Sequence, residues 1–109
     1  MIVWSDKLRY GGRMSEGRIV KRIKKRLSLG KPVVGVYLVA LASNRENLID
    51  IMDVKELIFP YYKRQRIDVI GMAYSKDAAM ELTADIVNTV FLETGGFDVR
   101  AYYGEQGIK

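Results

Sequence analysis

The feature that most constrains the fold is a nearly unbroken apolar run within residues 31–45, which ends abruptly in polar residues. The run from Val33 to Leu41 is rich in β-branched side chains, is entered through Pro32 and does not alternate between apolar and polar positions. A strand of this composition is typical of the interior of a sheet whose two faces are both covered. The sequence therefore predicts a buried central strand within an α/β domain.

Polar residues at the end of this run carry the signals of a helix start. Ser43 and Glu46 have the capping-box spacing. In a capping box the serine hydroxyl accepts a hydrogen bond from the backbone amide three residues later, and the glutamate carboxylate accepts one from the backbone amide of the serine. A helix is therefore expected from Asn44. Asp53 and Glu56 repeat the spacing, which leaves open a break followed by a short second helix. The core-facing residues of the first helix are expected to be Leu48, Ile51 and Met52.

The remaining segments predict an alternation of strands and helices. In chain order these are an edge strand within the otherwise weakly ordered residues 1–14, a helix capped by Ser15 that reaches Leu29, a second buried strand at 67–73, a long helix from Ser75 or Asp77 to Glu93, a final strand at 97–103 and a frayed tail at 104–109. Strands that alternate with such helices imply right-handed crossovers and a mainly parallel sheet. The expected fold is a single compact α/β domain over residues 1–109, with three or four mainly parallel strands flanked by helices in the order β(edge)-α-β-α-β-α-β.

The amino-acid composition excludes several kinds of chemistry. The chain contains no Cys and no His, so it lacks disulfides, thiolate metal ligands, cysteine nucleophiles and the imidazole that most often transfers protons near neutral pH. The motifs G-x-G-x-x-G, G-x-x-x-x-G-K-[ST] and G-x-S-x-G are also missing. We therefore expect no metal and no cofactor and favour a protein without catalysis. The alternative of turnover of a phosphate- or carboxylate-bearing small molecule stays open, and a hydrolase would need Ser43 or Ser75 activated by Lys76.

Hydropathy and charge indicate the compartment and the class of partner. Nowhere do 18 apolar residues run together, and no charged leader precedes a long apolar segment, so a cytoplasmic protein with no membrane partner is expected. The formal charge is +5, and residues 1–31 hold ten Lys and Arg against two acids, a charge of +8. Residues 32–109 hold eight against eleven, a charge of −3. This asymmetry favours an anionic partner for the N-terminal part.

The expected helix before Gly30 is amphipathic and almost purely cationic on its outer side. At about 100° per residue, its apolar side chains share an arc of about 100°, and basic residues cover most of the rest. Such a surface binds a polyanion through counterion release, and nearby tyrosines stack exposed bases. A simpler interpretation, which stays open, is a solvated face with no partner. The candidate residues for binding nucleic acid or an acidic protein surface are Arg18, Lys21, Arg22, Lys24, Lys25, Arg26, Tyr61, Tyr62, Lys63, Arg64 and Arg66.

A second candidate site is the pair of polar turns that follow the two buried strands. If these strands are parallel neighbours, the turns open on one rim, where helix N-termini and two cations hold a phosphate or carboxylate. The alternative is that the serines are ordinary helix caps. The candidate residues for binding a small anion are Ser43, Asn44, Arg45, Ser75 and Lys76.

The long helix from residue 76 onward has an unusually wide apolar surface. Its apolar side chains cover about 200° of the helix circumference, twice the usual stripe. One sheet face cannot cover all of it, so a second helix or a homodimer through Ala78–Phe91 is expected. Asp77, Glu81 and Asp85 recur every four residues along this helix, but by rise alone they span about 12 Å and cannot surround one ion. We expect these carboxylates to face solvent.

Overall fold

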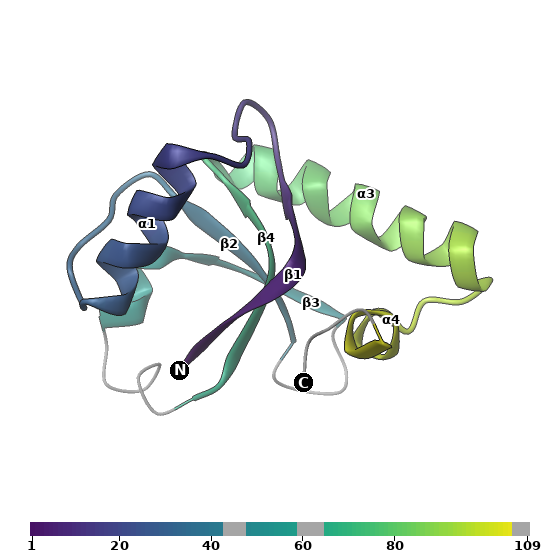
Figure 1. Ribbon diagram of the computed structural model, residues 1–109. Helices are drawn as coiled ribbons and strands as arrows, with labels where there is room; N and C mark the ends of the chain where they lie inside the picture. Colours follow the sequence, from purple (N-terminus) through teal and green to yellow (C-terminus); the bar gives the residue numbers. More distant parts are fainter. Residues whose placement is uncertain (43–47, 59–64, 106–109) are drawn as a thin grey trace.

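The computed structural model describes residues 1–42, 48–58 and 65–105, and in this part a four-stranded sheet carries helices on both faces (Figure 1). The strands are β1 (Ile2–Tyr10), β2 (Tyr37–Leu41), β3 (Ile49–Asp53) and β4 (Ile67–Ala73). The helices are α1 (Arg18–Ser28), the 3-10 helix η1 (Val54–Ile58), α3 (Lys76–Thr94) and α4 (Val99–Glu105). The Cα radius of gyration is 13.2 Å, which is the size of one compact domain of about 100 residues. The chain is a single α/β domain.

The strand order is β1-β4-β2-β3, and the sheet is mixed. β1 lies parallel to β4, whereas β2 is antiparallel to both β4 and β3. The predicted mainly parallel sheet is therefore wrong, as is the strict alternation of strands and helices. The reason is the length of a connection. Only residues 42–48 separate β2 from β3, and a parallel crossover needs about a dozen residues or more.

The central strand β2 is shorter than the apolar run that predicted it. Gly35 has a φ of 74°, a left-handed conformation that interrupts the extended chain, and Val34 is 86% exposed. Within β2, neighbouring side chains point to opposite faces. Leu38 packs in the cluster beneath α1, and Val39 packs in the cluster beneath α3. Both faces of this strand are buried, as its composition predicts.

The segment expected to form a helix after β2 is the edge strand β3. Ile49 and Ile51 pack against the cluster beneath α3, and Leu48 lies before the strand, 47% exposed. Periodicity alone cannot distinguish a strand from a helix in so short a run, and pairing with β2 decides it. The short helix expected after a break near Met52 is present, although a strand and not a helix precedes it. η1 follows Asp53, whose Oδ1 accepts from the Lys55 amide at 3.1 Å.

The ends of the two long helices are mostly as predicted. α1 is preceded by Gly17, which makes no side-chain cap, so the predicted cap at Ser15 is wrong. Its predicted end is confirmed by Gly30, which has a φ of 69°. α3 begins at Ser75, whose hydroxyl accepts an amide hydrogen bond at 3.1 Å, and ends at Gly95, with a φ of 76°. These caps set the limits of the helix that covers one sheet face.

The two ends of the chain depart from expectation in different ways. The N-terminal edge strand is confirmed, and β1 extends it to nine residues. The predicted final strand at 97–103 is wrong, because α4 occupies most of it. Val99 and Tyr103 are buried against α3, and the same alternation that suggests a strand also places them four residues apart on one helical face. Of the predicted tail, residues 106–109 lie outside the described residues.

Candidate nucleic-acid interface

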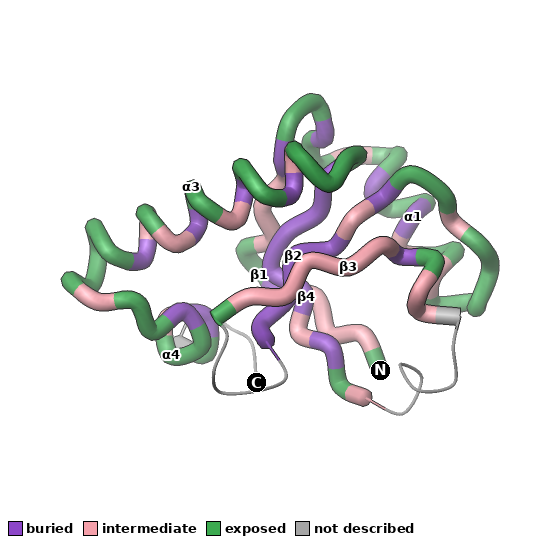
Figure 2. Tube along the Cα trace, turned by 180° about the vertical axis from the view of Figure 1, so that it is seen from behind, coloured by how far each residue is buried: buried purple, intermediate pink, exposed green. Residues whose placement is uncertain are grey.

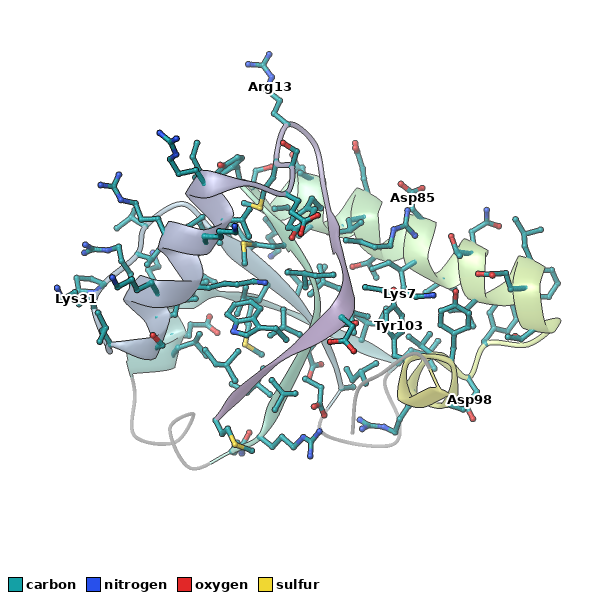
Figure 3. The ribbon with its side chains drawn as sticks, viewed as in Figure 1. Lys7, Arg13, Lys31, Asp85, Asp98 and Tyr103 are labelled. Carbon is teal, nitrogen blue, oxygen red and sulfur yellow. The ribbon has the colours of Figure 1, made fainter. Side chains whose placement is uncertain are left out.

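The helix α1 presents one face to the sheet and the opposite face to solvent. Val20 and Ile23 are buried, and Leu27 packs in the same cluster, which also contains Trp4. α1 contains no acidic residue. In Figure 3 its long side chains reach away from the sheet and end in nitrogen atoms. The sheet therefore orients a mostly cationic surface outward, although Ile19, expected in the apolar arc, is 62% exposed.

Two of the six basic residues of α1 contact other parts of the domain. The Arg26 guanidinium donates through Nε and one terminal nitrogen to the Pro32 carbonyl, at 3.2 and 3.0 Å. The Lys24 amino group lies 5.2 Å from the centroid of the Trp4 ring, within the range of a cation–π interaction. Both side chains are thus partly engaged by the fold. Sequence alone did not separate them from the other four.

The other four basic residues of α1 share the outward face. Arg18, Lys21, Arg22 and Lys25 are all exposed. At about 100° per residue they fall within an arc of about 100°, and they extend over about 10 Å along the helix axis. We call these four residues the cationic face.

Further basic side chains lie at the two ends of α1. Arg13 and Lys31 are both exposed, and Figure 3 labels them beyond opposite ends of the helix. Neither was among the predicted site residues, although both belong to the segment of charge +8. Glu16 is the acid closest in sequence to α1. Burial and, next, the charge of Glu16 raise the pKa of Tyr10, so that phenol stays neutral near the basic helix.

An apolar pocket of about 380 Å³ adjoins the C-terminal end of α1. Trp4, Leu27, Val33 and Leu57 line it together with other apolar side chains. Lys31 also contributes to its lining. An aromatic, mostly apolar pocket with a cation nearby suits the flat apolar group of an anionic ligand.

The second half of the predicted polyanion site is only partly described. Arg66 lies just before β4, and its Nε donates to Asp68 Oδ1 at 2.8 Å, so a carboxylate offsets its charge. Tyr61, Tyr62, Lys63 and Arg64 lie outside the described residues. Their part in binding stays a prediction.

The small-anion site was predicted on the condition that the two buried strands are parallel neighbours, and this condition is not met. Because β2 and β4 are antiparallel, Ala73 lies opposite Tyr37, so β4 ends beside the start of β2 and not beside its end. The idea that these strands bring both turns to one rim is wrong. Ser75 caps α3, and Lys76 is exposed at its start. Ser43, Asn44 and Arg45 lie outside the described residues, so anion binding there stays a prediction.

The carboxylates of α3 lie apart from any cluster. Asp77, Glu81 and Asp85 are exposed. Over residues 1–42, 48–58 and 65–105, no three acidic side chains come close enough to hold a metal ion. Within these same ranges, no helix combines the length and the apolar character that crossing a membrane requires.

A polar contact joins α4 to the C-terminal part of α3. The Tyr102 hydroxyl donates to Glu93 Oε2 at 2.5 Å, and this hydrogen bond raises the pKa of Tyr102 to about 12. Burial raises the pKa of the neighbouring Tyr103. Both phenols are therefore neutral at physiological pH. They hold α4 in place and add no charge.

A scan against protein-family models and searches of curated proteins and of solved structures find no match to this chain.

Proposed function

We propose that this protein is a non-catalytic binding module that contacts nucleic acid through the cationic face of α1. The observation that carries the proposal is the orientation of Arg18, Lys21, Arg22 and Lys25, all exposed on one side of a helix that contains no acid. Phosphates displace condensed counterions when they bind such a surface, and this release drives association. A helix that needed only solubility would not require four like charges within one arc of about 100°.

The pocket beside α1 favours a single strand over a duplex. Unpaired bases can stack on aromatic side chains or enter an apolar pocket, whereas bases in a duplex are stacked on one another. Trp4 lines the pocket, and Lys24 lies over its ring. A strand whose phosphates follow the cationic face could place a base against the pocket.

The salt dependence of binding tests the phosphate contacts. Each contact with a single strand contributes about −0.7 to the slope of log K against log salt, so four contacts give about −2.8. Binding of a labelled single-stranded oligonucleotide is measured by fluorescence anisotropy from low to physiological salt. Trp4 is the only tryptophan in the chain, so its emission reports separately whether a base approaches the pocket.

A pair of charge-matched variants locates the site. The double variant K21Q/K25Q removes two charges from the cationic face, and K7Q/K55Q removes two exposed charges elsewhere. We expect the first variant to lower the magnitude of the salt slope by about 1.4 and to weaken binding at low salt. The second variant should change the slope and the low-salt affinity far less.

Three outcomes would overturn the proposal. One is no nucleic-acid binding at low salt. Another is equal loss of affinity in both double variants, which would mean that net charge alone drives association. The third is binding of an acidic peptide with none of an oligonucleotide, which would assign the cationic face to a protein partner.

A further inference from the structure

Helix α3 carries two apolar rows. Its buried row, which includes Leu82 and Ile86, packs on the sheet. A second row follows spacings of four, three and four residues, which is the pattern of a seam between two helices. Met80 and Phe91, at the ends of this second row, are 54% and 43% exposed. The members of the second row are Met80, Ala84, Val87 and Phe91.

A stacked aromatic pair extends the second row at its C-terminal end. The ring of Phe97, in the connection to α4, lies 5.0 Å from the ring of Phe91, with 18° between the ring planes. Phe97 is itself 54% exposed. Two rings stacked on each other at the surface create a larger apolar patch than scattered side chains do.

The second row lies on the flank of α3 that faces the β3 edge. On the β1 side, Arg9 donates to Thr89 Oγ1 at 3.1 Å, and a Cβ on Gly12 would lie 3.3 Å from that of Ala78. Val87 is about 160° around the helix from Thr89. It packs in the cluster to which Ile51 of β3 belongs.

The outer edge of β3 is the other unpartnered feature on this flank. β3 ends the strand order, so no strand of the described ranges pairs with its outer side. Figure 2 shows β3 across the front of the sheet, with α3 beside it. An exposed edge strand offers its main-chain groups to another strand.

We propose that a second copy of this chain covers the flank, with β3 antiparallel to β3 of the second copy and the second apolar rows of the two α3 helices in contact. One twofold axis normal to the sheet makes both pairs antiparallel at once, so a single self-complementary surface accounts for both features. The strong positive charge does not oppose this dimer. α1 lies on the other face of the sheet.

The side chains of β3 and α3 are compatible with this twofold axis. With Ile51 opposite its own copy, Asp50 faces Met52 and Asp53 faces Ile49, so no two carboxylates lie directly opposite. Along α3, an axis between Ala84 and Val87 places Phe91 against Met80 and Ala84 against Val87, so the large side chains meet at the two ends and the smaller ones at the centre. Lys76 then lies beside the C-terminal turn of the other helix, where carbonyl groups carry partial negative charge.

The state of association is measured by size-exclusion chromatography with light scattering at tens of micromolar. We expect a mass of twice 12.4 kDa. The variant M80E/F91E should be a monomer with an unchanged circular dichroism spectrum, because both side chains point outward. Leu92→Glu is the matched control. Leu92 is 72% exposed on the opposite flank of the same helix, so this variant should remain a dimer.

Hydrogen exchange tests the sheet contact. Amides of β3 should exchange at least about tenfold more slowly in the dimer than in M80E/F91E, while amides of β1 should not differ. A wild-type monomer at tens of micromolar overturns the proposal. So does a dimer that survives M80E/F91E, a dimer that L92E disrupts equally, or β3 amides that exchange alike in both states. None of these outcomes bears on nucleic-acid binding by α1.

Discussion

The amino group of Lys24 lies 5.2 Å from the centroid of the Trp4 ring, so α1 and β1 are joined by a cation–π contact as well as by apolar packing. This relationship distinguishes Lys24 from the cationic face. It also places a charged group next to the single tryptophan, whose fluorescence reports on the contact.

Lys24→Gln should destabilise the domain, whereas Lys25→Gln should not. Loss of the cation–π contact is expected to lower the free energy of unfolding by about 0.5–1 kcal/mol and to change Trp4 emission. Lys25 points outward, so Lys25→Gln should leave the free energy of unfolding and the Trp4 emission unchanged and should weaken oligonucleotide binding instead. Urea denaturation followed by Trp4 fluorescence measures both variants. Equal destabilisation would contradict the structural assignment of Lys24.

Gly71→Ala should destabilise the core by about 1–3 kcal/mol. A Cβ at this position would lie 2.7 Å from Leu82 Cδ2 and 3.2 Å from Val39 Cβ, so the buried Leu82 side chain must repack and Val39 must move by a few tenths of an ångström. Gly96→Ala is the control, because a Cβ there meets nothing within 4 Å. Chemical denaturation of both variants measures the difference. A neutral Gly71→Ala would mean that α3 packs less closely on the sheet.

Ser75→Ala should cost about 1 kcal/mol, and Ser15→Ala should be close to neutral. Ser75 accepts from the Ala78 amide at 3.1 Å and caps α3. Ser15 is exposed and does not cap α1, although its position in the sequence suggests that role. The midpoint of thermal unfolding should fall only in Ser75→Ala. Similar shifts in both variants would contradict the assignment of caps.

Stability should fall at high pH as Tyr102 ionises. Its hydrogen bond to Glu93 raises the pKa of the folded state to about 12, above the ordinary value of 10.0. The folded state therefore favours the protonated phenol. The resulting stability is fully present below pH 10 and is lost as pH rises from 10 towards 12.

Absorbance of ionised tyrosine measures this titration. Tyr102→Phe should remove a phenol that titrates late, and Glu93→Gln should lower the pKa of Tyr102 towards 10.0, because the charged acceptor is gone. A difference between the titrations of the wild type and Tyr102→Phe that develops near pH 10 would show that Tyr102 ionises as an ordinary tyrosine and would contradict the assignment.

The cationic face could be found from sequence because it depends on local order alone. The apolar residues of α1 recur at helical spacing, and all the remaining positions except Ser28 are basic, so burial of one face directs basic side chains outward. Sequence did not reveal that Lys24 and Arg26 are engaged by Trp4 and Pro32, since those contacts join separate segments. It likewise missed Arg13 and Lys31, which lie beyond the helix ends.

By itself the sequence determined which segments are buried, where α1 ends and where α3 begins and ends. The both-sided burial of β2, the cap at Ser75 and the stop at Gly95 follow from side chains that act within a few residues of one another. Only the tertiary structure decided that β2 and β4 are antiparallel, that β3 is a strand and that Val99 and Tyr103 face α3 from a helix. Hydrophobic periodicity records that a residue is buried, but the direction of a strand and the identity of its neighbour depend on connection lengths and on contacts between distant segments.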